Sequence, residues 1–236
     1  MLYKSDQEKL DIYRMSQLLD NFPNYCFFEE VKSKKRVTLD VDTYLYYIHS
    51  GYFVNYLGIQ KEEKRTFVAI LHVGDDVGMG NFFKIERADY INELQAITNS
   101  SLIKIDKEFF ISVLEQHEEL ISNVFVKIQQ ELEYLRRAQI LSIIPIEKYV
   151  KYMLHLFSKA MGMPNGGEIM LPKEVTRRYL SNLSNISMTP INETFSKLER
   201  DGIIREDDGI ISILDHVLLD EQVSVFSSVV GGNRDA

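Results

Sequence analysis

The residues most suggestive of chemistry lie in the segment 175–204, where polar and basic side chains alternate with apolar ones at helical spacing. Thr176 and Ser187 each precede such a run, and Thr and Ser are preferred residues at the start of a helix. The pair Ser184-Asn185 predicts a tight turn, because Asn tolerates a left-handed backbone. Pro190 fits the second helix because it falls in the first turn, where its missing N–H has no helical partner. The segment therefore predicts two helices joined by a short turn.

A short hairpin is expected to follow the second helix. That helix should bury Ile191, Phe195 and Leu198 and end at Asp201-Gly202. Beyond it, the β-type runs IIRE and IISI flank Asp207-Asp208-Gly209, a typical hairpin turn. Two helices and a hairpin form a winged helix-turn-helix, whose second helix can lie in the major groove of DNA.

The polar side chains of this segment are the candidate DNA contacts. Each of them alone is more often a solvated surface residue, but as a set they could position a duplex through its phosphates and read its bases. The candidates are Thr176, Arg177, Arg178, Ser187, Met188, Thr189, Asn192, Glu193, Ser196, Lys197 and Arg200.

The first half of the chain should supply a β-rich domain. The runs Tyr44–His49 and Tyr52–Leu57 are separated by Ser50-Gly51, and Glu93–Thr98 turns at Asn99-Ser100 into Ser101–Ile105. Each pair predicts a hairpin. Such hairpins with no helices between them indicate an antiparallel roll or barrel of the jelly-roll type. An earlier segment, Asp6–Leu19, predicts a helix.

A long helix is expected to connect the two halves, because no Gly or Pro occurs from Lys107 to Ile144. Its apolar residues fall at alternating spacings of four and three, which favours either a core helix packed on its own roll or a coiled coil between two copies. We expect one stripe to face the roll and the other to face a partner. The partner stripe, and hence the dimer interface, would be Ile121, Phe125, Ile128, Leu132 and Leu135.

These elements give an α+β protein with three parts. Residues 1–110 form the β-roll sensor domain, 111–144 the dimerisation helix and 145–236 the winged helix-turn-helix domain. The last part begins with a helix over Glu147–Met161 and a short strand over Glu168–Leu171.

Composition excludes several other classes. No apolar stretch approaches the ~20 residues that span a bilayer, and the first residues are too polar for a signal peptide, so we expect a soluble cytoplasmic protein. The single cysteine, Cys26, excludes an internal disulfide, a thiolate zinc finger and a cysteine-ligated iron–sulfur cluster. The five histidines form no metal spacing, so neither a metal nor a cofactor is expected.

The net charge of −8 would argue against a nucleic-acid partner if it were evenly spread. Residues 146–214 instead carry 9 basic and 9 acidic side chains. The excess of acid therefore lies outside the segment that is predicted to meet DNA, which permits a local basic face there.

The chain as a whole resembles the Crp/Fnr family of transcription regulators. GDDVGMGNFF (Gly74–Phe83) is similar to the GDxxGExxLF segment of that family's β-roll. VTRRYLSNLSNIS (Val175–Ser187) resembles [IL]TRxxLAxxxGxS, and FSKLERDGII (Phe195–Ile204) resembles LxxLExxGLI. The divergent motifs suggest the PrfA-like branch.

The resemblance implies a cyclic-nucleotide-binding-like β-roll, a dimerising helix and a winged helix. It implies a homodimer on a palindromic operator, with RNA polymerase as a further candidate partner and a small-molecule effector that the sequence does not identify. It also matches Thr176 and Arg177 to the phosphate-binding start of the first helix of the motif.

The site residues depart from the cyclic-AMP-binding members of the family. Met79 stands where those members carry the ribose-binding Glu, and Tyr90 and Ile91 stand where they carry the phosphate-binding Arg-Ser/Thr pair. Only a slip in this alignment would bring Arg87 to the phosphate. Because apolar side chains cannot neutralise a phosphate, we do not expect control by cyclic AMP.

The base-reading residues depart as well. The family pattern S-R-E-T-V-x-R corresponds here to Ser187–Glu193, with Met188 and Glu193 in place of the two arginines and Thr189 in place of the glutamate. Loss of both arginines removes the forked contact with guanine. A different and more A·T-rich operator is therefore expected.

Two other functions compete with DNA binding. No nucleotide-binding glycine loop, nucleophile elbow or HExxH motif occurs, which disfavours an enzyme. The acidic character of the second helix favours the alternative of a ligand-sensing protein whose winged helix binds another protein instead of DNA.

Overall fold

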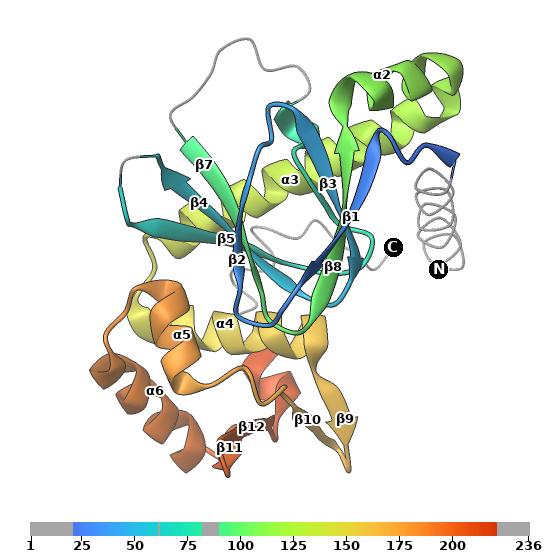
Figure 1. The fold of residues 1–236 in the computed structure, drawn as a ribbon. Coiled ribbons are helices and arrows are strands. Elements are labelled where there is room, and N and C mark those ends of the chain that lie inside the picture. Colours follow the sequence, from blue (N-terminus) through green and yellow to red (C-terminus); the bar gives the residue numbers. More distant parts are fainter. Residues whose placement is uncertain (1–20, 61, 82–89, 221–236) are drawn as a thin grey trace. The chain divides into compact units, whose positions relative to one another are not determined.

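The computed structural model describes residues 21–60, 62–81 and 90–220 of the chain (Figure 1). The expected helix Asp6–Leu19 and Arg87 lie outside these residues. The contacts between residues divide the chain into two compact units, Met1–Leu135 and Arg136–Ala236.

The first unit contains two four-stranded antiparallel sheets. One has the order β1 (Cys26–Val31), β8 (Ser100–Asp106), β3 (Tyr44–Ser50) and β6 (Asp76–Val77). The other has the order β2 (Arg36–Leu39), β7 (Tyr90–Ala96), β4 (Phe53–Ile59) and β5 (Arg65–Leu71). This confirms the antiparallel roll that the turn-rich runs predicted.

The two hairpins predicted within the roll are wrong. β3 pairs with β8 and β6, while β4 pairs with β5 and β7, so Ser50-Gly51 carries the chain from one sheet to the other. Gly51 has a φ of 77°, and the backbone N–H of Tyr52 donates to Ser100 Oγ at 3.1 Å. The turn at Asn99-Ser100 likewise connects strands of different sheets, β7 and β8. Two sheets that face each other can bury the apolar faces of all these strands, which one extended sheet cannot do.

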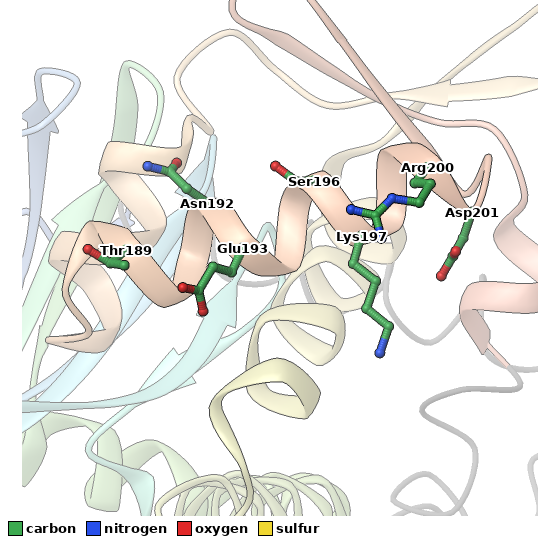
Figure 2. A pocket seen from close by; sticks show the side chains of 7 residues that line it. All are labelled: Thr189, Asn192, Glu193, Ser196, Lys197, Arg200 and Asp201. Atoms are coloured by element: carbon green, nitrogen blue, oxygen red, sulfur yellow. The ribbon is translucent and has the colours of Figure 1, made fainter.

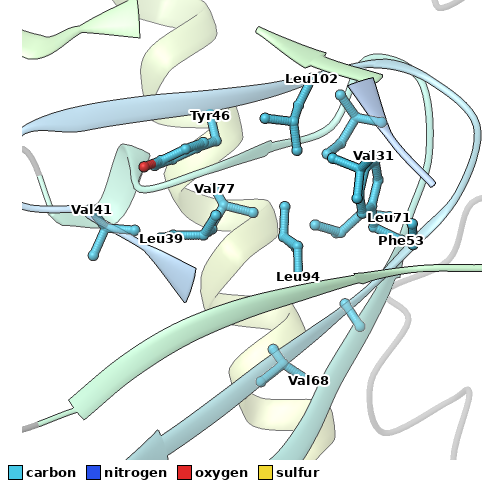
Figure 3. Close-up of a cluster of buried hydrophobic side chains, with 13 residues drawn as sticks. Val31, Leu39, Val41, Tyr46, Phe53, Val68, Leu71, Val77, Leu94 and Leu102 are labelled. Carbon is cyan, nitrogen blue, oxygen red and sulfur yellow. The ribbon is translucent and has the colours of Figure 1, made fainter. Parts of the chain in front are cut away.

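The core of the roll fills the space between the sheets (Figure 3). Phe53, Leu94 and Leu102 are fully buried there. A second cluster packs on the opposite face of β3 and β8 and includes Leu45 and Ile103. The interior of the roll is therefore close-packed with large apolar side chains in the described residues.

The long helix is interrupted, which the sequence did not predict. α2 (Lys107–Gln116) ends at His117, a 3-10 turn follows as η2 (Glu118–Leu120), and α3 covers Ile121–Leu141. Phe110 of α2 and Val124 of α3 pack into the same cluster on the roll. In an unbroken helix these two side chains would lie about 21 Å apart along the axis, so the break lets both reach one small surface.

The second unit has the order of elements expected of a winged helix-turn-helix. A four-stranded antiparallel sheet has the order β11-β12-β10-β9. The helices and strands are α4 (Ile146–Met161), β9 (Met163–Asn165), β10 (Glu168–Met170), α5 (Arg177–Ser184), α6 (Met188–Arg200), β11 (Ile204–Asp207) and β12 (Ile210–Ile213). Together with the roll, this confirms the α+β fold class.

None of the helices in the described ranges combines the length and the apolar character that crossing a bilayer requires.

Candidate nucleic-acid interface

The turn between α5 and α6 forms as its residues predict. Thr176 caps α5, with its hydroxyl oxygen accepting a hydrogen bond from the N–H of Tyr179 at 3.1 Å. Leu180 and Leu183 are buried, and Asn185 ends the helix in the left-handed conformation with a φ of 55°. A left-handed residue at this position turns the chain sharply into the next helix.

Ser187 occupies the N-cap position of α6, but not in the way expected. Its side chain makes no capping hydrogen bond to the described residues of the helix, and it is exposed. The exposed Ser187 thus lies at the N-terminus of α6, where the helix dipole favours an anion.

α6 has one buried face and one polar face. Ile191, Phe195 and Leu198 are fully buried against the rest of the second unit. The opposite face lines an open pocket of about 600 Å³ (Figure 2), formed by Thr189, Asn192, Glu193, Ser196, Lys197, Arg200 and Asp201. Met188 is also exposed, at the start of the same helix. The structure thus brings together most of the predicted DNA-contact residues on one exposed helix face.

The hairpin after α6 is the predicted wing. β11 pairs with β12, and Asp208 and Gly209 form the turn with φ values of 50° and 77°. Arg205 in the wing lies 2.9 Å from Glu168 and 2.6 Å from Asp207. The wing itself has one cation, Arg205, against three carboxylates, Glu206, Asp207 and Asp208, so its sequence makes it acidic.

Arg177 lies in a different setting from the phosphate contact expected of it. Its Nη2 is 2.7 Å from Glu199 Oε1, and its Nε donates to Glu206. The guanidinium also stacks 4.6 Å from the ring centre of Phe195, and only 23% of the side chain is exposed. Arg177 therefore joins α5, α6 and β11, and its charge is balanced by two carboxylates of its own unit.

Lys197 also has a carboxylate partner. Glu147 Oε1, in the first turn of α4, lies 2.8 Å from the Lys197 ammonium and 2.6 Å from that of Lys151. These two donors lower the pKa of Glu147 to about 2. The remaining cations of the predicted set, Arg178 and Arg200, are exposed.

The predicted dimer stripe on α3 is solvent-accessible in the single chain. Phe125 is 62% exposed, and Ile121, Leu132 and Leu135 are exposed as well. Ile128 is the exception, since it packs partly against the cluster that contains Phe110. An apolar stripe of this kind on one helix is a typical self-association surface.

The opposite side of α3 contacts the segment that runs from Gly74 through β6 into η1 (Met79–Asn81). Lys127 donates to the carbonyl of Gly74 and lies 3.9 Å from Asp76, Gln130 donates to Asp75 at 3.2 Å, and Glu131 accepts from the N–H of Gly80 at 2.8 Å. Burial raises the pKa of Asp76 to about 7, and neighbouring Glu131 and Asp75 add to this effect. These contacts fix α3, which bears the apolar stripe, to the β-roll of the same chain.

The positions compared with a cyclic-nucleotide site, Met79, Tyr90 and Ile91, carry no charged side chain. Met79 is buried in the cluster with Leu45 and Ile103, so its side chain belongs to the core. Tyr90 and Ile91 are half-buried.

Burial raises the pKa of the Cys26 thiol to about 11, as for an unreactive core cysteine.

Within the described ranges, no three His, Cys, Asp or Glu side chains come together as a metal site.

Three acidic residues of the second unit were missed as site residues. Glu147, Glu199 and Glu206 each hold a cation that the sequence had assigned to DNA. Their partners lie 22 to 50 positions away along the chain, so no local pattern marked them.

The sequence matches no protein-family model, and no curated protein is detectably similar to it in sequence. Solved structures do share the fold. A transcriptional regulator of the Crp/Fnr family from Thermus thermophilus is 19% identical with a TM-score of 0.64, over 84% of this chain and 98% of that one. A cyclic nucleotide-binding domain containing protein from Listeria monocytogenes is 15% identical with a TM-score of 0.67, over 88% of this chain and 97% of that one. The c-di-GMP responsive regulator CLP from Xanthomonas campestris is 18% identical with a TM-score of 0.63, over 85% of this chain and 99% of that one. The chain therefore has the Crp/Fnr-type fold over most of its length.

Proposed function

We propose that this protein is a transcription regulator of the Crp/Fnr type that binds double-stranded DNA through α6 and is not an enzyme. The observation that carries the proposal is the polar exposed face of α6, which follows the Asn185 turn and precedes the wing. A helix presented in this way fits the width of the major groove. The shared fold with proteins whose names describe transcription regulators supports the same function.

We further propose that the protein acts as a homodimer on a palindromic operator. The exposed stripe that includes Phe125 and Leu132 supports this state, because paired apolar helices bury such residues. A two-fold dimer would present two copies of α6, and half-sites one duplex turn apart would meet them.

Control by cyclic AMP is not part of the proposal. Met79 is a core residue, and the described interior of the roll is filled by apolar side chains. Neither feature offers a counter-charge for a cyclic phosphate. Contact with RNA polymerase, control by another effector and membership of the PrfA-like branch stay predictions.

A winged helix that binds a protein is the second candidate. The acidic wing, with Asp207 and Asp208 at its turn, and Glu193 on α6 favour it, because carboxylates repel phosphate. Its partner would carry a basic surface that matches these carboxylates.

Electrophoretic mobility shift with genomic DNA fragments distinguishes the two candidates. We expect discrete complexes whose affinity falls by orders of magnitude between ~50 and ~200 mM salt, because phosphate contacts release counterions. The variant Ser196→Glu should lose these complexes, while Gln116→Glu, which adds the same charge on α2, should keep them. Equal binding by both variants, or none by the parent protein, would reject DNA binding through α6.

A further inference from the structure

One carboxylate in the second unit holds two lysines. Glu147 Oε1 accepts hydrogen bonds from Lys151 within α4 and from Lys197 on α6. The carboxylate is fully ionised near neutral pH, since both ammonium groups depress its pKa. Two cations and one anion meet at this point.

The two lysines are not equivalent. Lys151 is 11% exposed and belongs to the same helix as Glu147, at the favourable spacing of four residues. Lys197 is 51% exposed and reaches Glu147 from another helix. Lys197 can therefore leave the carboxylate without exposing an unpaired buried charge, because Lys151 stays.

Lys197 also belongs to the polar face of α6. It lines the same pocket as Asn192, Ser196 and Arg200, and Figure 2 shows its long side chain extending away from Asn192 and Ser196. A DNA phosphate offers an ammonium group the same kind of charge-assisted hydrogen bond that Glu147 offers. Lys197 has a single positive charge, so an ammonium already paired with Glu147 gains less from a phosphate than an unpaired one would.

We propose that Glu147 is an internal competitor of DNA phosphate for Lys197, and that this contact limits the affinity of the protein for all duplexes. The inference rests on the proposed function, since it describes how binding through α6 is restrained. In the unbound protein Lys197 is already neutralised, so its transfer to phosphate replaces one ion pair by another and gains little. The restraint is general because phosphate contacts carry no sequence information.

The test compares Glu147→Gln, Lys197→Gln and the double variant with the parent protein. Each is titrated with a duplex selected from a random pool and with a random-sequence duplex of equal length. Glu147→Gln should bind both duplexes roughly two- to fivefold more tightly, as expected from the free energy of one exposed ion pair. The gain should vanish in the double variant, because it depends on the released ammonium.

A gain that persists without Lys197, or a Glu147→Gln variant that binds no more tightly than the parent, would overturn the proposal. If the parent protein binds no duplex, the proposed function fails and the inference falls with it. Binding of a duplex by the parent protein therefore distinguishes failure of the inference from failure of the proposed function.

A second comparison keeps the test decisive if Glu147→Gln does not fold. Lys197→Gln and Arg200→Gln remove one cation each from the same exposed face. Competition by Glu147 predicts the smaller loss of affinity for Lys197→Gln. Equal losses would contradict it.

Discussion

Arg177 Nη2 lies 2.7 Å from Glu199 Oε1, which ties the first residue of α5 to the last turn of α6. Glu206 of β11 holds the same guanidinium from the other side. Arg177, which the family resemblance matched to a phosphate contact, thus stabilises the helix-turn-helix itself.

Replacing Arg177 should therefore change stability more than salt dependence. We expect Arg177→Ala to lower the free energy of unfolding by about 1–2 kcal/mol, between the values for exposed and buried ion pairs. Thermal unfolding measures this loss. The exposed Arg178→Ala should leave stability unchanged and lower the salt slope of DNA binding by about one unit. Unchanged stability with a lowered salt slope for Arg177→Ala would contradict its supporting role.

The exposed stripe on α3 gives a prediction about assembly. Phe125→Asp should abolish the homodimer, because a carboxylate buried in an apolar seam is not solvated. Sedimentation velocity would then report a monomer. Val126→Asp makes the same type of change at a residue of similar exposure beside the stripe, and it should remain dimeric. Loss of the dimer in both variants would place the interface elsewhere.

The buried Asp76 gives a prediction about pH. Its pKa in the folded protein is about 7, above the ordinary value of 3.8, so the folded state binds the proton more tightly than the unfolded state. Stability linked to this group is therefore fully present below a pH of about 4 and is lost as the pH rises through about 7. Ionisation of Asp76 should cost roughly 4 kcal/mol at a pH of about 8.

Asp76→Asn removes that cost. The variant should unfold at a higher temperature than the parent at pH ~8, with the difference shrinking at pH ~5. Asp42→Asn, at an exposed position in the same unit, is the control. Its unfolding temperature should equal that of the parent at both pH values. If the pH profile of Asp76→Asn matches that of the parent, the carboxylate is not the titrating group.

The base-reading face of α6 gives a prediction about the operator. Met188 and Glu193 are exposed and lack the guanidinium that forks onto guanine, so selection from random DNA should return half-sites other than the G-rich ones of the family. The double variant Met188→Arg/Glu193→Arg should shift the selected sites towards guanine, by ~1–3 kcal/mol for each restored contact. Recovery of a G-rich half-site by the parent protein would refute this.

The winged helix was predictable from the sequence because its signals are local. The Thr176 cap, the Asn185 turn and the Asp208-Gly209 hairpin each depend on a few neighbouring residues. The helix face followed from the apolar spacing that buries Phe195 and Leu198.

Other features depend on residues that are distant in sequence. The strands beside Gly51 have the same pattern whether they pair with each other or face each other in two sheets, so the hairpin was not distinguishable from a sheet-to-sheet crossing. The break at His117 contains neither Gly nor Pro and arises because two helices pack on one surface. The carboxylates that hold Arg177 and Lys197 are likewise set by tertiary contacts.

The most direct test of DNA binding by a dimer is the mass of the complex in solution. Sedimentation equilibrium of the full chain with a duplex selected from a random pool should give two protein chains per duplex, and Phe125→Asp should reduce both the assembly and the affinity. A chain that stays monomeric and leaves every duplex unbound at low salt would contradict DNA binding by a dimer.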